Sequence, residues 1–302
     1  MKPSSWLPDF DDTESDPDSD TQRLDDAAGD DASAPRPAVA AGLPAATPRI
    51  DAGERYTLGQ RLGQGGTGAV WSAHDTLLAR QVAIKLLNLQ GDAEERAALA
   101  AQVLDEARAA ARLSHPHIVT VHDTGLGLDG SAYIAMELLR GQDLAELLRG
   151  GWRPSLEQAA MIARRVADAL GYAHSKGVVH RDIKPANLFM VGRTRPVVLD
   201  FGLAQLMRAP GSGAVMGSPH YAAPEQFNGS ECDARSDLYS LGVVLYELLT
   251  GERPYTGASL AAIRERVQRG GAPPPSQRVP AVPAALDALV MQAMALNPAD
   301  RP

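Results

Sequence analysis

Residues 180–187 of the chain read HRDIKPAN, and residues 200–202 follow them as DFG. Upstream, residues 82–85 read VAIK, which puts a lysine inside an apolar stretch. In this order the three segments supply a cation for a phosphate group, a carboxylate that can orient a hydroxyl, and two oxygen ligands for a metal ion. Phosphoryl transfer from ATP needs these groups, so the three segments together predict both a fold and a chemistry.

A glycine-rich segment, GQGGTGAV at residues 63–70, precedes the lysine. Glycines let main-chain N–H groups approach phosphate oxygens without a side-chain clash. Alone, the spacing would also suit a dinucleotide-binding loop or a tight turn, but a position between two expected strands favours the kinase type of loop. Over residues 56–302 the chain therefore resembles the eukaryotic-like (Hanks-type) serine/threonine protein kinases of bacteria.

Composition sets the outer limits of this interpretation. Residues 1–50 hold 11 Asp and Glu against 4 Lys and Arg, a net charge of −7, whereas the remaining residues carry only −1. A near-neutral domain of this kind argues against a nucleic-acid partner. The single cysteine, Cys232, allows no internal disulfide and fits a reducing compartment, so we expect a cytoplasmic protein.

The sequence also bears on membrane association. No apolar run reaches the ~18 residues needed to span a bilayer, and the acidic N-terminus is not a secretory signal. Family domains normally continue through one more helix beyond the position of residue 302, so the domain is expected to lack that helix. The resemblance implies that a longer form would carry any membrane anchor after that point.

The fold class predicted is α+β, a two-lobed protein-kinase-like fold. Residues 1–50 are expected to be disordered, because an acid-rich stretch and an Ala/Pro-rich stretch bury too little apolar surface to offset chain entropy. A small antiparallel β lobe with one helix is expected at about 56–138, and a larger, mostly helical lobe at about 139–302. The strands are expected at 56–62, 70–73, 82–87, 119–122 and 132–136. Helices are expected at 93–113, from the capping-box pair Ser155 and Gln158 to about 175, and at 238–249. A short hairpin is expected at 188–199, between the HRD and DFG segments.

The resemblance assigns roles to six catalytic-site residues. Lys85 would hold the α- and β-phosphates of ATP and pair with Glu106, in preference to the nearby acids Glu94, Glu95 and Asp105. Asp182 would orient the acceptor hydroxyl and take its proton, while Asn187 and Asp200 would bind Mg²⁺, with Mn²⁺ as an alternative. Lys184 is typical of serine/threonine-type members, where it meets the transferred phosphate.

The same resemblance predicts the nucleotide pocket. Met136 would stand at its back, and main-chain groups of Glu137 and Leu139 would bond the adenine. For each apolar residue the alternative is ordinary core packing. The residues assigned to the ATP site are Leu62, Gly63, Gly65, Gly66, Gly68, Val70, Ala83, Lys85, Met136, Glu137, Leu139 and Leu188 or Phe189.

Several further residues are expected to support the site. Glu225, in the segment Ala-Pro-Glu, would be buried against Arg301, and Asp237 would hold the backbone of the loop that starts at His180. His115 and His117 fit a helix-ending turn better than a metal site, because no further ligands are in evidence.

Regulation is predicted at one serine and in the acidic segment. Arg181 usually faces an activating phosphate in this family, and between residues 200 and 225 Ser212 is the hydroxyl left to carry it. The alternative is a kinase that is active without a phosphate at Arg181. The resemblance implies protein substrates with Ser or Thr, autophosphorylation and a homodimer. The acidic segment 1–50 is interpreted first as a solvating leader; the alternative is that phosphothreonine within it binds an FHA-type partner. The alternatives are a pseudokinase or nucleotide-binding scaffold, and a small-molecule phosphotransferase.

Overall fold

The computed structural model describes residues 55–65, 68–89, 91–127, 130–201, 218–229 and 232–302. The predicted disordered segment 1–50, Gly66 and Ser212 lie outside these residues. None of the described helices is long and apolar enough to cross a membrane.

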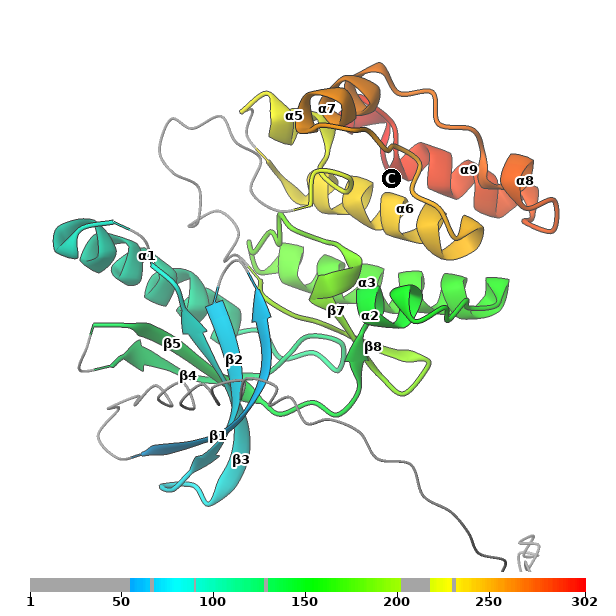
Figure 1. Cartoon of the computed structure of the whole chain (residues 1–302). Coiled ribbons are helices and arrows are strands. Elements are labelled where there is room, and N and C mark those ends of the chain that lie inside the picture. The colour runs from blue at the N-terminus through cyan, green and yellow to red at the C-terminus, as the bar shows by residue number, and fades with distance from the viewer. Residues whose placement is uncertain (1–54, 66–67, 90, 128–129, 202–217, 230–231) are drawn as a thin grey trace, which may run out of the picture. The chain divides into compact units, whose positions relative to one another are not determined.

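The first part of the domain is a five-stranded antiparallel sheet (Figure 1). Its strand order is β1-β2-β3-β5-β4, as the fold prediction requires. The strands run over β1 Tyr56–Gly65, β2 Gly68–Asp75, β3 Arg80–Leu87, β4 Val121–Leu126 and β5 Ala132–Glu137. β1 and β2 therefore extend into the glycine-rich segment, where Gly65 pairs with Gly68.

Helix α1, Ala93–Ala111, packs against β4 and β5 of this sheet. Asp92 caps its first turn, since its side chain accepts hydrogen bonds from the N–H groups of Glu94 and Glu95, and Glu95 bonds back to the Asp92 N–H. Three of its four buried residues are alanines, with Val103 as the fourth. The helix therefore presents a shallow apolar side to the sheet.

The second part is mostly helical, with a small hairpin in front of it. Ser155 and Gln158 form the predicted capping box at the start of α3, Leu156–Ser175, and the chain turns away at Gly177 with a φ of 77°. The shorter elements here are β6 Gln142–Asp143, α2 Leu144–Arg149, η1 Pro185–Asn187, β7 Leu188–Val191 and β8 Arg195–Val198. β7 and β8 form the predicted short hairpin between the HRD and DFG segments.

Helix α6, Ala234–Thr250, is the centre of the helical part (Figure 1). It is buried nearly all round and packs against α3 and α9, as its continuous apolar sequence predicts. It begins four residues earlier than expected, at an Asp233 N-cap, and ends at Gly251, whose φ of 77° suits glycine. The remaining helices are α5 Pro224–Phe227, α7 Leu260–Arg269, α8 Pro275–Arg278, α9 Ala284–Ala293 and η2 Pro298–Asp300.

A buried carboxylate fixes the β2–β3 turn. Asp75 has no exposed surface, and its two oxygens accept bonds from Arg55 Nε and Nη2 at 3.0 Å each. The N–H groups of Leu77 and Leu78 bond the same carboxylate at 3.2 Å. The Arg55 bond, helped by these amides, lowers the pKa of Asp75 to about 2.

This arrangement predicts a pH dependence of stability. A carboxyl group with a lower pKa in the folded chain stabilises the fold above its unfolded pKa of about 4, and this contribution is lost as the pH falls toward 2. The difference in unfolding free energy between the wild type and Asp75→Asn should therefore shrink between about pH 5 and about pH 2.5, measured by urea titration at both values. An unchanged difference would contradict this account of the turn.

Candidate active site

The HRDIKPAN loop gathers its polar side chains around Asp182. Lys184 Nζ donates to Asp182 Oδ2 at 2.6 Å, and Asn187 Nδ2 donates to the same oxygen at 3.0 Å and to the main-chain oxygen of Asp182 at 2.8 Å. The carboxylate is about one-fifth exposed, so it remains open to a substrate hydroxyl. The loop therefore holds a charged acceptor beside one cation and one amide.

Asp237 of α6 bonds the main chain of this loop, as predicted. Its fully buried carboxylate accepts bonds from the main-chain N–H groups of His180 at 2.8 Å and Arg181 at 2.7 Å. The imidazole Nε2 of His174 lies 2.8 Å from the same group, a contact that the sequence did not suggest. Arg181 has a φ of 67°, a conformation that costs energy in a residue other than glycine, and these bonds hold it there.

The DFG segment faces the lysine of β3 across the site. Lys85 Nζ donates to Asp200 Oδ2 at 2.7 Å, although the two residues are 115 positions apart. Burial would raise the pKa of Asp200, but the charge and hydrogen bond of Lys85 outweigh it and hold the pKa below its usual value. Asp200 is thus a carboxylate at neutral pH. Phe201 packs edge-on against the His180 ring at 4.7 Å, which anchors the segment.

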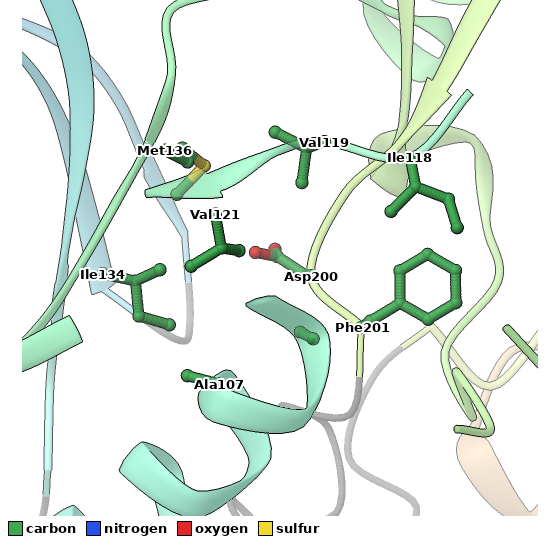
Figure 2. A pocket seen from close by; sticks show the side chains of 9 residues that line it. Ala107, Ile118, Val119, Val121, Ile134, Met136, Asp200 and Phe201 are labelled. Carbon is green, nitrogen blue, oxygen red and sulfur yellow. The ribbon is translucent and has the colours of Figure 1, made fainter. Parts of the chain in front are cut away.

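The ion pair expected between Lys85 and Glu106 is not formed in this structure. Glu106 lies half-buried on α1, and the buried ammonium group of Lys85 bonds Asp200 instead. Between α1 and the DFG segment there is an apolar cavity of about 20 Å³, lined by Ala107 and Ala110 on the helix side (Figure 2). Two small alanine side chains form the helix side of this cavity.

The cavity and the predicted nucleotide pocket have Met136 in common (Figure 2). Met136 lines it, and Met136 pairs with Ala83 in the register of β3 and β5. Both side chains are buried, as is Leu188, whereas Val70 and Leu139 are half-buried and Leu62 is half exposed. The N–H of Glu137 bonds the Thr120 oxygen at 2.9 Å, which leaves the Glu137 carbonyl as its main-chain group for a base.

The glycines of the β1–β2 connection differ in their surroundings. A Cβ added at Gly68 would lie 1.9 Å from the Leu86 oxygen, so sheet packing itself requires glycine there. Gly63 and Gly65 have open space at the same place. Packing within the protein does not demand glycine at these two positions, which fits the approach of a phosphate group to the main chain.

The predicted pair between Glu225 and Arg301 is formed and is bidentate. Arg301 Nη1 and Nη2 donate to the two Glu225 oxygens at 2.7 and 2.9 Å, and the arginine side chain has no exposed surface. Burial would raise the pKa of Glu225, but the bonds from Arg301 and Ser236 lower it. Neighbouring Gln226 donates to the Arg181 carbonyl at 2.9 Å, so this segment is tied to the catalytic loop.

The histidines weighed as metal ligands have structural contacts. His117 Nδ1 lies 2.8 Å from the Pro196 oxygen, and the His115 ring stacks on Tyr172 at 5.4 Å. Within the described ranges, no group of three or more His, Cys, Asp or Glu side chains is placed to hold a metal ion. The helix-ending turn is therefore the better interpretation of both residues.

Comparison with known proteins agrees with this geometry. Residues 56–302 match the model of the protein kinase domain, and the chain belongs to this family, whose members use ATP and a divalent metal ion. Over 82% of its length the chain is 41% identical to a probable serine/threonine-protein kinase of Streptomyces coelicolor and 37% identical to the serine/threonine-protein kinase pkn3 of Myxococcus xanthus. It is 39% identical to PknB of Mycobacterium tuberculosis. The matches cover 37%, 47% and 41% of those proteins, so the chain spans less than half of their length.

Proposed function

We propose that the chain is a serine/threonine protein kinase that transfers the γ-phosphate of ATP to Ser and Thr hydroxyls of proteins, itself included. The observation that carries the proposal is the convergence of Lys85 and Asp200 with the Asp182–Lys184–Asn187 group at one site. The N–H of Leu199, next to Asp200, bonds the main-chain oxygen of Asn187 at 2.9 Å and joins the two groups. Lys184 favours the serine/threonine class. ATP as the substrate fits a cytoplasmic reaction.

Two residues fit a magnesium ion by their chemistry. Asp200 is a carboxylate, and Asn187 uses its amide nitrogen toward Asp182, which leaves the amide oxygen for a metal. Such hard oxygen donors suit Mg²⁺, with Mn²⁺ as an alternative. The bound ion would neutralise charge on the phosphates.

The protein residues then divide the work of transfer. Lys85 and the amides of the glycine-rich connection hold the phosphates, while Asp182 orients the acceptor hydroxyl and accepts its proton. Lys184, 2.6 Å from Asp182, meets the negative charge on the transferred group. Most of the rate enhancement comes from positioning and charge neutralisation, because little covalent chemistry falls to the protein.

Glu106 remains a proposed partner of Lys85 in the nucleotide-bound state. Asp200 would hold the metal ion in that state, and Glu106 is the acid of α1 proposed to pair with Lys85. Glu106→Gln should therefore lower kcat by about tenfold or more while leaving the urea midpoint unchanged, because Glu106 has no ion pair to lose in the described structure. Exposed Asp105→Asn on the same helix is the matched control. An equal effect of both changes would contradict the role of Glu106.

Two other functions were considered for the same site. A pseudokinase or scaffold would bind nucleotide without transfer, and the complete set of Lys85, Asp182, Asn187 and Asp200 disfavours it. A small-molecule phosphotransferase would not need the segment at Glu225, which is clamped to Arg301 and linked through Gln226 to the catalytic loop. A panel of aminoglycoside, choline and protein substrates separates these activities.

Regulation and partners are proposed on the same basis. Among the described residues Arg181 has no acidic partner, so a phosphate on Ser212 remains the proposed occupant of its side chain. Phosphorylated threonines in residues 1–50 would bind an FHA-type domain, and autophosphorylation between copies would proceed in a homodimer. Unchanged activity of Ser212→Ala would reject the switch.

The proposal is tested by incubating the purified chain with labelled ATP and Mg²⁺ beside Asp182→Ala, followed by mass-spectrometric mapping. We expect phosphate on Ser or Thr in the wild type only. Intact ATP binding without incorporation into this chain or into a panel of Ser/Thr proteins would overturn the proposal in favour of a scaffold.

A further inference from the structure

A basic face is formed where the α2–α3 loop meets the turn of the β7–β8 hairpin. We name it the hairpin face and define it by Arg153, Arg165, Arg193 and Arg195. These four arginines carry a formal charge of +4. Because residues 51–302 as a whole carry about −1, this charge is concentrated locally.

Printed contacts bring these residues together. The Arg193 guanidinium carbon lies 5.6 Å from the centre of the Trp152 ring, which connects the hairpin turn to the α2–α3 loop. Arg165 Nη1, from α3, donates to the Thr194 oxygen at 2.6 Å. The face is therefore continuous from helix to hairpin.

The four arginines are held by neutral groups. Arg153 Nη1 donates to the main-chain oxygens of Leu148 and Trp152 at 2.9 Å, and Arg195 Nη2 lies 3.4 Å from the Pro116 oxygen. In the described part of the chain none of the four forms an ion pair.

Other arginines of the same domain do have acidic partners. Arg301 pairs with Glu225, and Arg269 pairs with Glu265 on α7. The hairpin face is thus positioned by the fold while its positive charge is left for a ligand.

The hairpin face is separate from the catalytic residues, but the β7–β8 hairpin connects the two. β7 starts directly after Asn187, and β8 ends two residues before Asp200. Strands of four residues are about 13 Å long, so the hairpin turn lies at the end of the hairpin that is far from the metal ligands. A ligand bound there does not block the site.

We infer that the hairpin face docks an acidic, extended segment of a protein substrate and so raises the local concentration of its phosphorylatable Ser or Thr. This inference rests on the proposed kinase function. A nucleic acid is the less suitable occupant, because Trp152 is half-buried beneath Arg193 and offers no free ring for base stacking. The near-neutral domain also lacks the general positive field of a nucleic-acid-binding protein.

The test uses one acceptor peptide in two fusions. A linker of about 12 Gly and Ser residues, which spans about 20 Å on average, joins it to a probe with the sequence of residues 9–31. That sequence has 11 acids and one arginine; its Ser and Thr residues are replaced by Ala, and the neutral fusion carries Asn and Gln in place of the acids. The enzyme is the full chain. A second enzyme carries Asn and Gln in place of its own acids at residues 9–31, so that this segment cannot compete with the acidic fusion for the hairpin face.

For the wild type we expect a KM about tenfold lower for the acidic fusion than for the neutral one, with the same kcat and a difference that shrinks in salt. The double variant Arg193→Gln/Arg195→Gln should remove this difference. Arg269→Gln removes the same kind of charge from α7 and should leave it intact. Equal KM values for both fusions, in the wild type and in the neutralised chain, would overturn the inference.

Direct binding separates this inference from the proposed function. Fluorescence anisotropy of the labelled acidic probe should show about tenfold weaker binding to the double variant at low salt, even if no phosphate is transferred to any peptide. Absence of transfer alone would thus count against the kinase proposal and not against docking. Equal affinity of the wild type and the double variant for the acidic probe would contradict an acidic-peptide site. Tighter binding of single-stranded RNA than of the probe would contradict it as well.

Discussion

Asp182→Asn is expected to lower kcat for phosphate transfer by about 10³-fold. The amide oxygen can still accept the hydrogen bond from Lys184, but it cannot take the proton of the attacking hydroxyl. Since Lys85 and Asp200 are untouched, the affinity for ATP should stay within about twofold of the wild type. Initial rates with a protein substrate and a binding titration with a fluorescent ATP analogue measure the two quantities.

The matched control for this change is Asp168→Asn. Asp168 is an exposed carboxylate on α3 that lies 3.8 Å from Arg164, remote from the HRD loop. Its replacement should leave kcat unchanged. If Asp182→Asn keeps more than about a tenth of wild-type activity, a proton-accepting role for Asp182 is wrong.

Arg301→Met should destabilise the chain by about 3–5 kcal/mol. It removes the bidentate partner of Glu225 from a place where the arginine side chain is fully buried, so a carboxylate would remain with Ser236 as its hydrogen-bond donor. The released carbonyls of Ala295 and Leu296 add to the cost. Urea unfolding followed by circular dichroism gives the difference in free energy.

Two further variants isolate the ion pair. In Glu225→Gln/Arg301→Met no buried charge is left uncompensated, so the double variant should be more stable than Arg301→Met alone. Arg269→Met breaks only the exposed pair with Glu265 and should cost less than about 1 kcal/mol. Similar losses for Arg301→Met and Arg269→Met would contradict the clamp.

The sequence predicted the fold well where local patterns decide it. Alternating apolar strands, the Ser155–Gln158 capping box and the continuous apolar run before Gly251 each lead to a single element type, and the structure and family confirm these elements. Pairs implied by the resemblance at short motifs, such as Glu225 with Arg301, were also correct. In these cases one buried charge requires one partner.

The features that were missed depend on spacing in three dimensions. Lys85 bonds Asp200 and not Glu106 in the described structure. The sequence offers several acids to Lys85 but does not show which of them lies within reach of its ammonium group. The contact of His174 with Asp237 and the bond from Gln226 to the Arg181 carbonyl were likewise not predicted, because no sequence motif pairs these residues. The hairpin face arises from segments that only the fold brings together.

The central claim is that the Lys85–Asp200 and Asp182–Asn187 groups form a working phosphotransfer site. The most direct measurement is the initial rate of γ-phosphate transfer to a Ser/Thr protein, with phosphoamino-acid analysis of the product and ATP binding measured on the same preparation. The account predicts phosphoserine or phosphothreonine that depends on Mg²⁺ or Mn²⁺ and on Asp182. ATP binding with no phosphate transfer to any protein Ser or Thr would contradict it.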